Sequence, residues 1–373
     1  MKKVTGIIYR SIVKKILFLF PADIVHTLFL HVGYYLGKRK YFKNLVARMW
    51  RYESLSLEQT VLELNFKNPI GLSAGFDYNA DLVDVLPSIG FGFGTIGTLT
   101  HEPYAGNPAP MLGRLPKSRS LLVNKGFKNE SISKTLPKIM NKTGESVRGV
   151  SIGVTNKAYD SYEEMMSNLV AGFKDAERFD TFDYYELNIS CPNLRNIKHL
   201  TEQLASKDGL HNALTRMAAL NIQRPVFVKM PLEKDFTEIN ILIEAIVPFG
   251  FVRGLIFSNL VKDRTNKSFD KTEIQNAGTG NFSGKPVEDK SNELLKFAYK
   301  KYKERFILVG TGGVFTAEDA YTKIKNGATL VQLITGMVYQ GPQVIGEINE
   351  GLDRLLTQDG YKNIKQAIGI NVI

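Results

Sequence analysis

The feature that most constrains this 373-residue chain is a series of short apolar runs, beyond Ser54, that alternate with amphipathic stretches. Each run has the length of a buried strand, and several of the intervening stretches have helical periodicity. Eight continuous apolar strands with helices between them favour a closed parallel (β/α)8 TIM barrel over an open sheet. The predicted strands are Ile70–Ser73, Phe93–Ile96, Gly149–Ile152, Tyr184–Ile189, Val226–Lys229, Gly254–Phe257, Phe306–Val309 and Leu330–Leu333.

The segments between these strands predict helices and two long loops. Helices are expected at Tyr162–Phe173, Gly209–Leu220 and Glu238–Phe249, where apolar residues follow helical spacing. Long loops are expected at Glu102–Pro116 and Lys262–Asn281, after the second and sixth strands. Because barrels of this kind build their sites at the C-terminal ends of the strands, these loops are candidates for a functional site.

The net charge of +11 is concentrated at the start of the chain. In residues 1–53, eleven Lys and Arg residues outnumber Asp23 and Glu53 and leave a charge of +9, so the other 320 residues carry only +2. A nucleic-acid-binding protein would present its basic residues over the folded domain. We therefore expect no nucleic-acid partner.

The basic segment also contains two apolar stripes at helical spacing, from Ile8 to Leu19 and from Val25 to Leu36. Neither stripe approaches the roughly 20 apolar residues that span a bilayer. Two amphipathic helices with a cationic fringe would suit an anionic membrane surface, whereas a helical hairpin packed on its own domain would give the same pattern. We expect residues 1–53 to form this helical extension and residues 54–373 to form the barrel.

Cys191 is the only cysteine and directly follows a predicted strand. An intramolecular disulfide is excluded, and the five scattered histidines do not complete a metal site with it. A literal G-x-G-x-x-G at Gly92, Gly94 and Gly97 overlaps a predicted strand and lacks the acidic residue about twenty positions later. We therefore predict neither a metal site nor a dinucleotide fingerprint.

Glycines at the ends of the last two strands predict an anion site. Gly312 and Gly313 end the seventh strand, and Thr335 follows the eighth. Backbone N–H groups before a helix are typical of the phosphate site of such barrels, although tight turns would need the same glycines. Lys229 ends the fifth strand at the same mouth. It needs an anionic partner there, which could be a phosphate, a reduced flavin or a structural Asp or Glu.

Together these segments resemble the dihydroorotate dehydrogenases, specifically the membrane-associated, quinone-dependent class 2. The resemblance covers nearly the whole chain and runs through "ILFLFPADIVHTLF", "NPIGLSAGFD", "FGFGTIGTLT", "GNPAPMLGRLP", "NISCPN", "VKMP", "FSGKP", "GTGGV" and "LVQLITG". It implies an FMN-binding barrel that oxidises dihydroorotate to orotate in pyrimidine biosynthesis and passes electrons to a quinone. It also implies a peripheral membrane protein, which we expect on the cytoplasmic face of a bacterial inner membrane.

The resemblance assigns roles by position. Cys191 falls at the catalytic base, which removes the C5 proton of dihydroorotate while a hydride leaves C6. His26 and Arg114 match positions near the quinone. Substrate contacts are implied for Tyr78, Asn124, Asn188, Asn193 and Asn259. FMN contacts are implied for Ala74, Gly75, Thr98, Ser151, Asn188, Lys229, Ser258, Ser283, Gly284, Gly312, Gly313, Ile334 and Thr335.

The sequence departs from the class 2 pattern at several of these positions. Class 2 members use serine as the base, whereas cysteine is the class 1 residue. Ser151 stands where the family has an FMN-binding asparagine, and Ile334 where it has a tyrosine. Asn124 is displaced by one position within "VNKGF". These changes bear on the substrate more than on the cofactor.

Tyr78 is the departure with the largest consequence, because the family has a lysine there. Its loss removes a positive charge beside the carboxylate of the substrate. We expect Lys125 or Lys128 to supply a replacement cation. Two alternatives remain open: a different FMN oxidoreductase that acts on another cyclic amide or enone, and a non-catalytic barrel that only binds its ligand.

Overall fold

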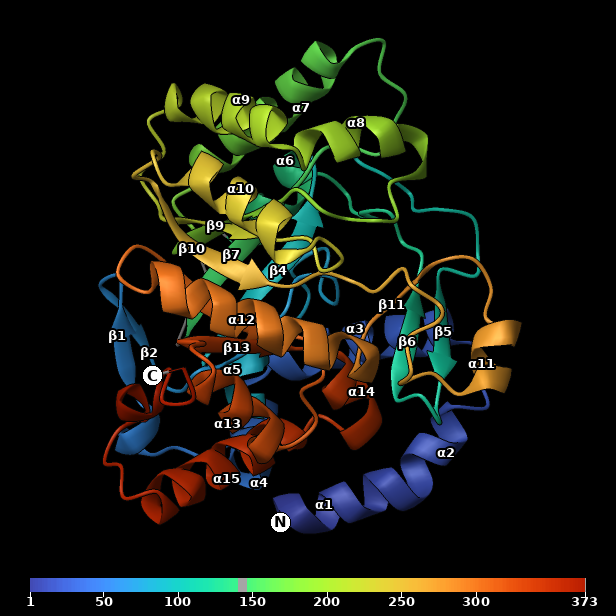
Figure 1. The fold of residues 1–373 in the computed structure, drawn as a ribbon. Helices are drawn as coiled ribbons and strands as arrows, with labels where there is room; N and C mark the ends of the chain where they lie inside the picture. The colour runs from blue at the N-terminus through green and yellow to red at the C-terminus, as the bar shows by residue number, and fades with distance from the viewer. Residues whose placement is uncertain (140–145, 373) are drawn as a thin grey trace.

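The computed structural model describes residues 1–139 and 146–372. Within these residues, eight parallel strands close into a barrel in chain order (Figure 1). The predicted barrel is therefore confirmed, and the observed bounds of β9 and β13 equal the predicted ones. The strands are β3 (Ile70–Leu72), β4 (Phe93–Leu99), β7 (Val147–Ile152), β8 (Tyr184–Asn188), β9 (Val226–Lys229), β10 (Val252–Phe257), β12 (Ile307–Thr311) and β13 (Leu330–Leu333).

Helices surround this barrel (Figure 1). The three predicted helices are present, with shifted ends, as α7, α9 and α10. The helices of the barrel and of its loops are α5 (Leu86–Ile89), α6 (Ile132–Thr135), α7 (Tyr162–Glu177), α8 (Lys198–Leu204), α9 (Lys207–Ala218), α10 (Phe236–Ile246), α11 (Lys271–Asn276), α12 (Glu288–Tyr302), α13 (Ala317–Lys325), α14 (Thr335–Gln340) and α15 (Val344–Gln358).

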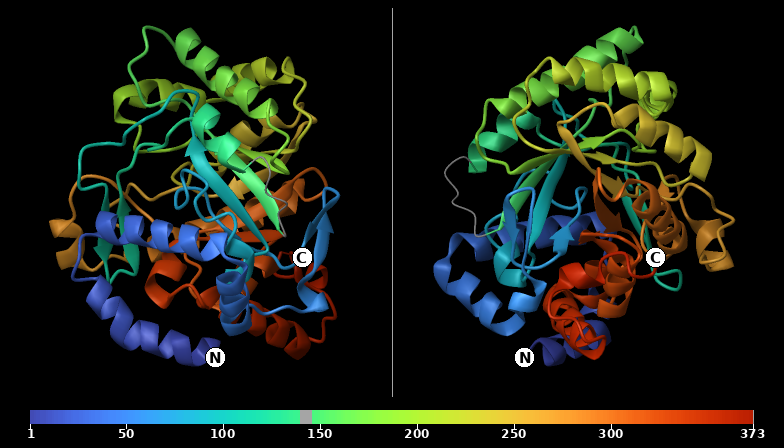
Figure 2. Two further views of the ribbon diagram at one scale, coloured as in Figure 1. Left: turned by 180° about the vertical axis from the view of Figure 1, so that it is seen from behind. Right: turned by 60° about the vertical axis from the view of Figure 1, so that its left-hand side comes forward.

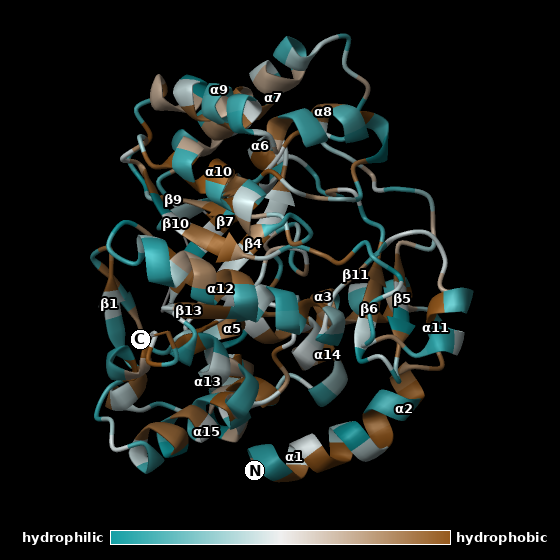
Figure 3. Ribbon diagram, in the orientation of Figure 1, coloured by the Kyte–Doolittle hydropathy of each residue, from teal (hydrophilic) through white to brown (hydrophobic). Residues whose placement is uncertain are grey.

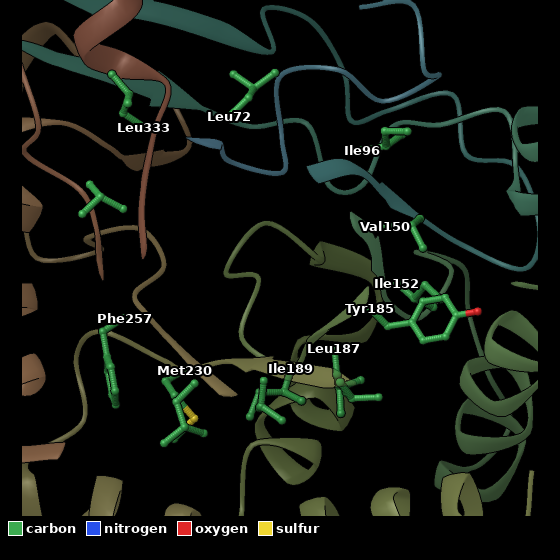
Figure 4. Close-up of a cluster of buried hydrophobic side chains, with 14 of the residues drawn as sticks. Leu72, Ile96, Val150, Ile152, Tyr185, Leu187, Ile189, Met230, Phe257 and Leu333 are labelled. Atoms are coloured by element: carbon green, nitrogen blue, oxygen red, sulfur yellow. The ribbon is translucent and has the colours of Figure 1, made fainter. Parts of the chain in front are cut away.

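Side chains alternate between the two faces of each barrel strand, as β8 illustrates. Tyr184 and Glu186 point inward, where both lie close to Thr95 of β4. Tyr185 and Leu187 point outward into the apolar layer under the helices, and the Tyr185 ring meets Phe173 of α7 edge-on. Figure 4 shows this outward layer, to which several strands contribute. Because both faces are buried, the strands appear in the sequence as continuous apolar runs.

A short hairpin closes the N-terminal end of the barrel. Its strands are β1 (Gln59–Val61) and β2 (Leu64–Phe66). The Phe66 ring packs edge-on against Phe93 at 5.5 Å, within a cluster of inward-facing apolar side chains. A ligand therefore has to enter at the opposite, C-terminal end, where the sites of such barrels lie.

The two predicted long loops contain secondary structure. A small antiparallel sheet of β5 (Leu112–Leu115), β6 (Ser120–Val123) and β11 (Asn281–Phe282) stands beside the barrel mouth, and α11 lies in the second loop. The expectation of plain loops was wrong there. These strands are short; β5 and β6 form a local hairpin, and β11 adds to it from a segment far along the sequence.

The N-terminal extension forms helices that pack against the barrel. Helix α1 (Lys2–Ile8), a π-helical turn (Tyr9–Val13) and α2 (Lys14–Leu17) follow one another, and then come α3 (Ala22–Lys38) and α4 (Lys40–Trp50). Two helices were expected, so α4 is an addition. Figures 1 and 2 show α1 beside α15, and Arg10 Nη1 of the π-helical turn lies 3.1 Å from Glu347 Oε2 of α15. We call residues 1–53 the head.

The helices of the head contain many hydrophobic residues (Figure 3). Most of the exposed large apolar residues in the described chain lie between Met1 and Leu45, including Leu19 at 82% exposure. Lys and Arg residues flank them on the same helices. Among the described helices, none combines the length and the apolar character needed to cross a membrane.

Candidate active site

A continuous cavity of about 320 Å³ extends from the C-terminal mouth of the barrel to the helices of the head. Head residues such as Val25, Phe29 and Trp50 line one end, and the strand ends line the other. The structure brings most of the predicted site residues together on this wall. They are His26, Ala74, Gly75, Tyr78, Thr98, Arg114, Asn188, Cys191, Asn193, Lys229, Ser258, Asn259, Ser283, Gly284, Gly312, Gly313, Ile334 and Thr335.

Two predicted site residues, Ser151 and Asn124, do not line the cavity but lie behind the residues that do. Ser151 is fully buried, and its hydroxyl lies 2.9 Å from Thr98 Oγ1. Asn124 is also buried, and its Oδ1 accepts a hydrogen bond from Asn107 Nδ2 at 3.0 Å. Their side chains thus act on residues that face the cavity or on the loops that carry them.

Cys191 follows β8 in the wall, beside a network of amide side chains. Asn188 Nδ2 donates to Thr98 Oγ1 at 3.0 Å. Asn259 Nδ2 donates to Ser190 Oγ at 3.0 Å, and the Ser190 hydroxyl donates to the Lys229 carbonyl oxygen at 3.0 Å. The two asparagine amides are therefore held in fixed orientations in the same cavity wall as Cys191.

Burial raises the pKa of Cys191 to about 11. The backbone N–H of Asn193 and the charges of Lys229 and Lys262 act in the opposite direction and are smaller. The thiol consequently holds its proton at neutral pH. Since only the thiolate can accept a proton, base chemistry at Cys191 should become faster as the pH rises.

Lys229 places a cation on the floor of the cavity, at the end of β9. Its Nζ lies 3.5 Å from Ser73 Oγ. Burial lowers the pKa of Lys229, and the charge of Glu186 counteracts this shift. Glu186 itself accepts hydrogen bonds from Thr95 and Gln332, each at 2.7 Å. The cation therefore has an acidic group near it within the barrel and also faces the cavity.

The end of β12 forms a cradle that only glycine permits. Gly312 and Gly313 have φ angles of +90° and +76°. A Cβ atom would lie 2.2 Å from Val287 Cγ1 at the first position and 2.3 Å from Glu288 Cβ at the second. Only glycine therefore lets this turn pack against the start of α12, and both glycines line the cavity, where their backbone can face an anion such as a phosphate.

Hydroxyl groups complete the donors around this cradle. Ser283 Oγ and Thr335 Oγ1 lie 2.7 Å apart on the cavity wall. Ser258 Oγ lines the same cavity and is buried without a hydrogen-bond partner among the described residues. A buried hydroxyl without a partner is costly, so a polar ligand group is the expected partner. The glycine cradle, these hydroxyls and Lys229 fit the phosphate and ring of FMN.

His26 and Tyr78 meet at the boundary between the head and the barrel. His26 Nε2 lies 2.9 Å from the Phe76 carbonyl oxygen, and the Tyr78 hydroxyl lies 3.3 Å from the same ring. Burial lowers the pKa of His26 to about 3, so its imidazole is neutral at physiological pH. Burial also raises the pKa of Tyr78, which keeps its hydroxyl protonated.

A lysine ammonium lies over the Tyr78 ring. Lys125 Nζ is 4.4 Å from the ring centroid and 4.0 Å from Asp23 Oδ1 of α3. Burial lowers the pKa of Lys125 to about 8. Lys125 and Lys128 both line the cavity. Of the two lysines named as candidate replacement cations, Lys125 thus lies directly beside Tyr78.

Arg114 occupies the head end of the cavity. Its Nη1 donates to the Phe20 carbonyl oxygen at 2.8 Å, and its guanidinium lies 4.6 Å from the centroid of the Phe18 ring. These contacts hold the connection between α2 and α3 against β5. Arg114 and His26, the two predicted quinone residues, both belong to this end of the cavity.

Sequence reasoning missed the residues that hold Asn193. Asn107 Nδ2 donates to the Asn193 carbonyl oxygen at 2.9 Å, and Asn281 Nδ2 donates to Asn193 Oδ1 at 2.7 Å. Asn107 lies in a Pro-rich loop, and Asn281 ends the second long loop. Their positions after strand ends were a signal, but no sequence pattern pairs them with Asn193.

Known proteins are similar to this chain in sequence. The family model for dihydroorotate dehydrogenase matches residues 56–356. The dihydroorotate dehydrogenase (quinone) of Sulfurovum sp. is 35% identical over 369 residues, which cover 96% of this chain and 97% of that one. The protein of the same name from Trichodesmium erythraeum is 31% identical over 337 residues, covering 88% and 87%.

A solved structure agrees with these relatives. The crystal structure of the Eimeria tenella DHODH in complex with ferulenol has a TM-score of 0.82 and 25% identity, and the match covers 94% of this chain and 96% of that one. The fold, the matched residues and the identity over most of the chain lead to one conclusion. This chain belongs to the dihydroorotate dehydrogenase family.

Proposed function

We propose that this enzyme oxidises dihydroorotate to orotate at the barrel mouth and passes the electrons to a quinone at the head. Relatives named dihydroorotate dehydrogenase (quinone) support the reaction. The observation that carries the proposal is the continuous cavity, because it joins Cys191 and the glycine cradle to the apolar residues of the head. An apolar electron acceptor could enter through the head without crossing the aqueous phase.

FMN is the proposed cofactor, and when bound it would accept a hydride and release two electrons in a later step. The cradle of Gly312 and Gly313 would hold its phosphate, with Ser283 and Thr335 as additional donors. Lys229 would place a positive charge beside the ring system. The buried Ser258 hydroxyl would gain the hydrogen-bond partner that it lacks among the described residues.

Cys191 is the proposed base for the C5 proton of dihydroorotate. Asn188, Asn193 and Asn259 would hold the pyrimidine against it, since their amides both donate and accept hydrogen bonds. The surrounding network fixes Asn188 and Asn259 before the substrate arrives. Such preorganisation is how an active site keeps a base and its target proton in line.

The head is proposed as a distinct unit, residues 1–53, that lies on a membrane surface, with residues 54–373 as the catalytic barrel. Its exposed apolar side chains and surrounding Lys and Arg residues suit an anionic lipid surface. Quinones dissolve in the membrane, so this placement would bring the acceptor to the head end of the cavity. We propose the cytoplasmic face of a bacterial inner membrane.

Two observations on the purified protein test this function. The protein should be yellow, and its flavin absorbance should bleach under anaerobic conditions when dihydroorotate is added. A colourless protein that does not bind added FMN would refute the cofactor assignment. Bleaching by a neutral cyclic amide, with no response to dihydroorotate, would instead indicate a different substrate on the same scaffold.

A further inference from the structure

Dihydroorotate carries a carboxylate, and a carboxylate taken into a closed cavity needs a cationic partner. Among the described residues, four cationic side chains line the cavity: Arg114, Lys125, Lys128 and Lys229. Arg114 is engaged at the head end with the Phe20 carbonyl oxygen and the Phe18 ring. Lys229 lies on the floor, where Glu186 is near it. The remaining candidates belong to the segment after β6.

We infer that Lys125 is the cation that binds the substrate carboxylate. This inference rests on the proposed function and names the specificity residue of the same site. The side chain of Lys125 is largely buried, at 11% exposure, so its ammonium has little access to water. An ammonium has three donors, and none of those on Lys125 makes a hydrogen bond to another described residue.

The surroundings of Lys125 hold the ammonium without neutralising it completely. The Tyr78 ring offers an aromatic face at 4.4 Å, which attracts a cation but carries no net charge. Asp23 Oδ1 is 4.0 Å away, at the limit of an ion pair. The other oxygen of Asp23 accepts the backbone N–H groups of Met111 and Leu112, at 3.0 and 3.2 Å. A ligand carboxylate can therefore compete with Asp23 for this ammonium.

Backbone contacts tie Lys125 to the loop that carries the proposed substrate residues. The Lys125 carbonyl oxygen accepts the Asn107 backbone N–H at 3.3 Å. The side chain of Asn107 in turn donates to the Asn193 carbonyl oxygen and to Asn124 Oδ1. The ammonium thus emerges from a segment that is fixed relative to Asn193, two residues from Cys191.

The protonation state of Lys125 predicts how ligand binding depends on pH, which is a second test of its role. The groups that face it are Asp23 and His26 from α3, Tyr78 from the loop after β3, and Lys128 on its own segment. Burial lowers the pKa of Lys125 to about 8, with Asp23 acting to raise it and Lys128 to lower it. The ammonium is present below this pKa and is lost as the pH rises through it. Affinity for a carboxylate ligand should therefore fall at alkaline pH.

The test compares two ligands that differ only in the carboxylate. Orotate and uracil are titrated into the oxidised holoenzyme, wild type and Lys125→Met, and dissociation constants are read from the visible spectrum. We expect Lys125→Met to weaken orotate roughly tenfold to a hundredfold, as for the loss of a charged hydrogen bond, and to leave uracil unchanged. A merely structural defect would weaken both ligands. The matched control is Lys117→Met, because Lys117 is an exposed lysine that precedes β6, whereas Lys125 follows this strand.

A rescue variant strengthens the test. Because the Tyr78 ring lies directly under the ammonium, Tyr78→Lys in the Lys125→Met background should restore much of the preference for orotate. An unchanged orotate-to-uracil ratio in Lys125→Met would overturn the inference, as would a loss seen only in Lys128→Met. If wild-type protein neither binds orotate nor responds to dihydroorotate, the proposed function itself fails, and that result is distinct from a failure of Lys125 alone.

Discussion

Asn107 Nδ2 donates a hydrogen bond of 2.9 Å to the Asn193 carbonyl oxygen, across 86 residues of sequence. Asn107 Oδ1 accepts from the Tyr104 hydroxyl at 2.7 Å and from Asn156 Nδ2 at 3.3 Å. With the bond to Asn124 added, both polar atoms of the amide are occupied. Asn107 therefore acts as a hub that holds the loop beyond Cys191 in place.

Removing this hub should damage the site. Asn107→Ala leaves buried acceptors on Asn193 and Asn124 without this donor, which costs about 1–3 kcal/mol of stability. We expect a lower midpoint of urea unfolding and weaker orotate binding. Asn65→Ala, on the exposed side of the hairpin at the other end of the barrel, should change neither. Unaltered orotate affinity in Asn107→Ala would show that the hub does not position Asn193.

The high pKa of Cys191 predicts a rate that rises with pH. Burial raises this pKa to about 11, so the thiolate fraction grows about tenfold per pH unit below that value. Anaerobic stopped-flow measurement of flavin reduction by dihydroorotate should show this rise. Cys191→Ala should keep the flavin but lose several orders of magnitude in rate, and Cys191→Ser should move the rise to higher pH. A pH-independent rate in the alanine variant, close to that of wild type, would remove Cys191 from the mechanism.

The exposed apolar face of the head predicts binding to lipid. Ile12, Ile16 and Leu19 are 56%, 53% and 82% exposed. Replacing all three with serine should weaken binding to anionic liposomes at least about tenfold, since each buried side chain of this size contributes about 1.5–3 kcal/mol when fully transferred. The matched control is Phe236→Ser with Ile241→Ser, two exposed apolar residues of α10. Equal sedimentation of all three proteins with liposomes would contradict the membrane assignment.

The burial of Lys323 lets us predict how the free energy of unfolding changes with pH. This side chain of α13 is buried, and its Nζ donates to Ser291 Oγ and Asn292 Oδ1, each at 3.0 Å. Burial lowers its pKa to about 7, whereas in the unfolded chain the pKa is about 10.4. Between these values the unfolded chain binds a proton that the folded chain does not. The unfolding free energy should therefore increase with pH in this window.

The measurement is urea unfolding, followed by circular dichroism at pH 7.5 and 9.5. The contribution of Lys323 is about 1 kcal/mol per pH unit in this window. Lys323→Met should lose it, so that its stability changes less with pH than that of wild type. Lys300→Met, on the exposed end of α12, should keep the wild-type slope. A Lys323→Met slope identical to wild type would mean that the buried lysine retains its proton in the folded protein.

The barrel could be predicted from the sequence because each of its strands is a continuous apolar run, which is visible within a few consecutive residues. Val226–Lys229 and Leu330–Leu333 are continuous apolar runs, and their predicted bounds equal β9 and β13. Helix α4 (Lys40–Trp50) was missed because Lys40, Lys43, Asn44 and Arg48 interrupt its apolar residues, and only Val46 is buried. The sheet of β5, β6 and β11 was missed for another reason: β11 is two residues long and finds its partner more than 150 residues earlier.

The candidate site also has parts that the sequence could predict and parts that it could not. The cavity gathers Cys191, Lys229 and the glycine cradle, which the sequence places at strand ends. The contacts around them depend on tertiary structure that no local pattern encodes. The Lys125 ammonium, for example, lies between Tyr78 and Asp23, from segments 47 and 102 residues earlier. The sequence could suggest a replacement cation but could not choose between Lys125 and Lys128.

The central claim is that electrons leave the barrel mouth through the cavity that opens at the head, and the reoxidation half-reaction tests it most directly. Val25 of α3 lines the cavity, whereas the adjacent Ile24 is 61% exposed. Flavin reduced by dihydroorotate is mixed with a long-chain quinone under anaerobic conditions, and the return of absorbance is timed. We predict rapid reoxidation in wild type and Ile24→Trp, and reoxidation slowed at least about tenfold in Val25→Trp with an unchanged reductive step. Equal reoxidation in both tryptophan variants, or none by quinone in wild type, would contradict the account.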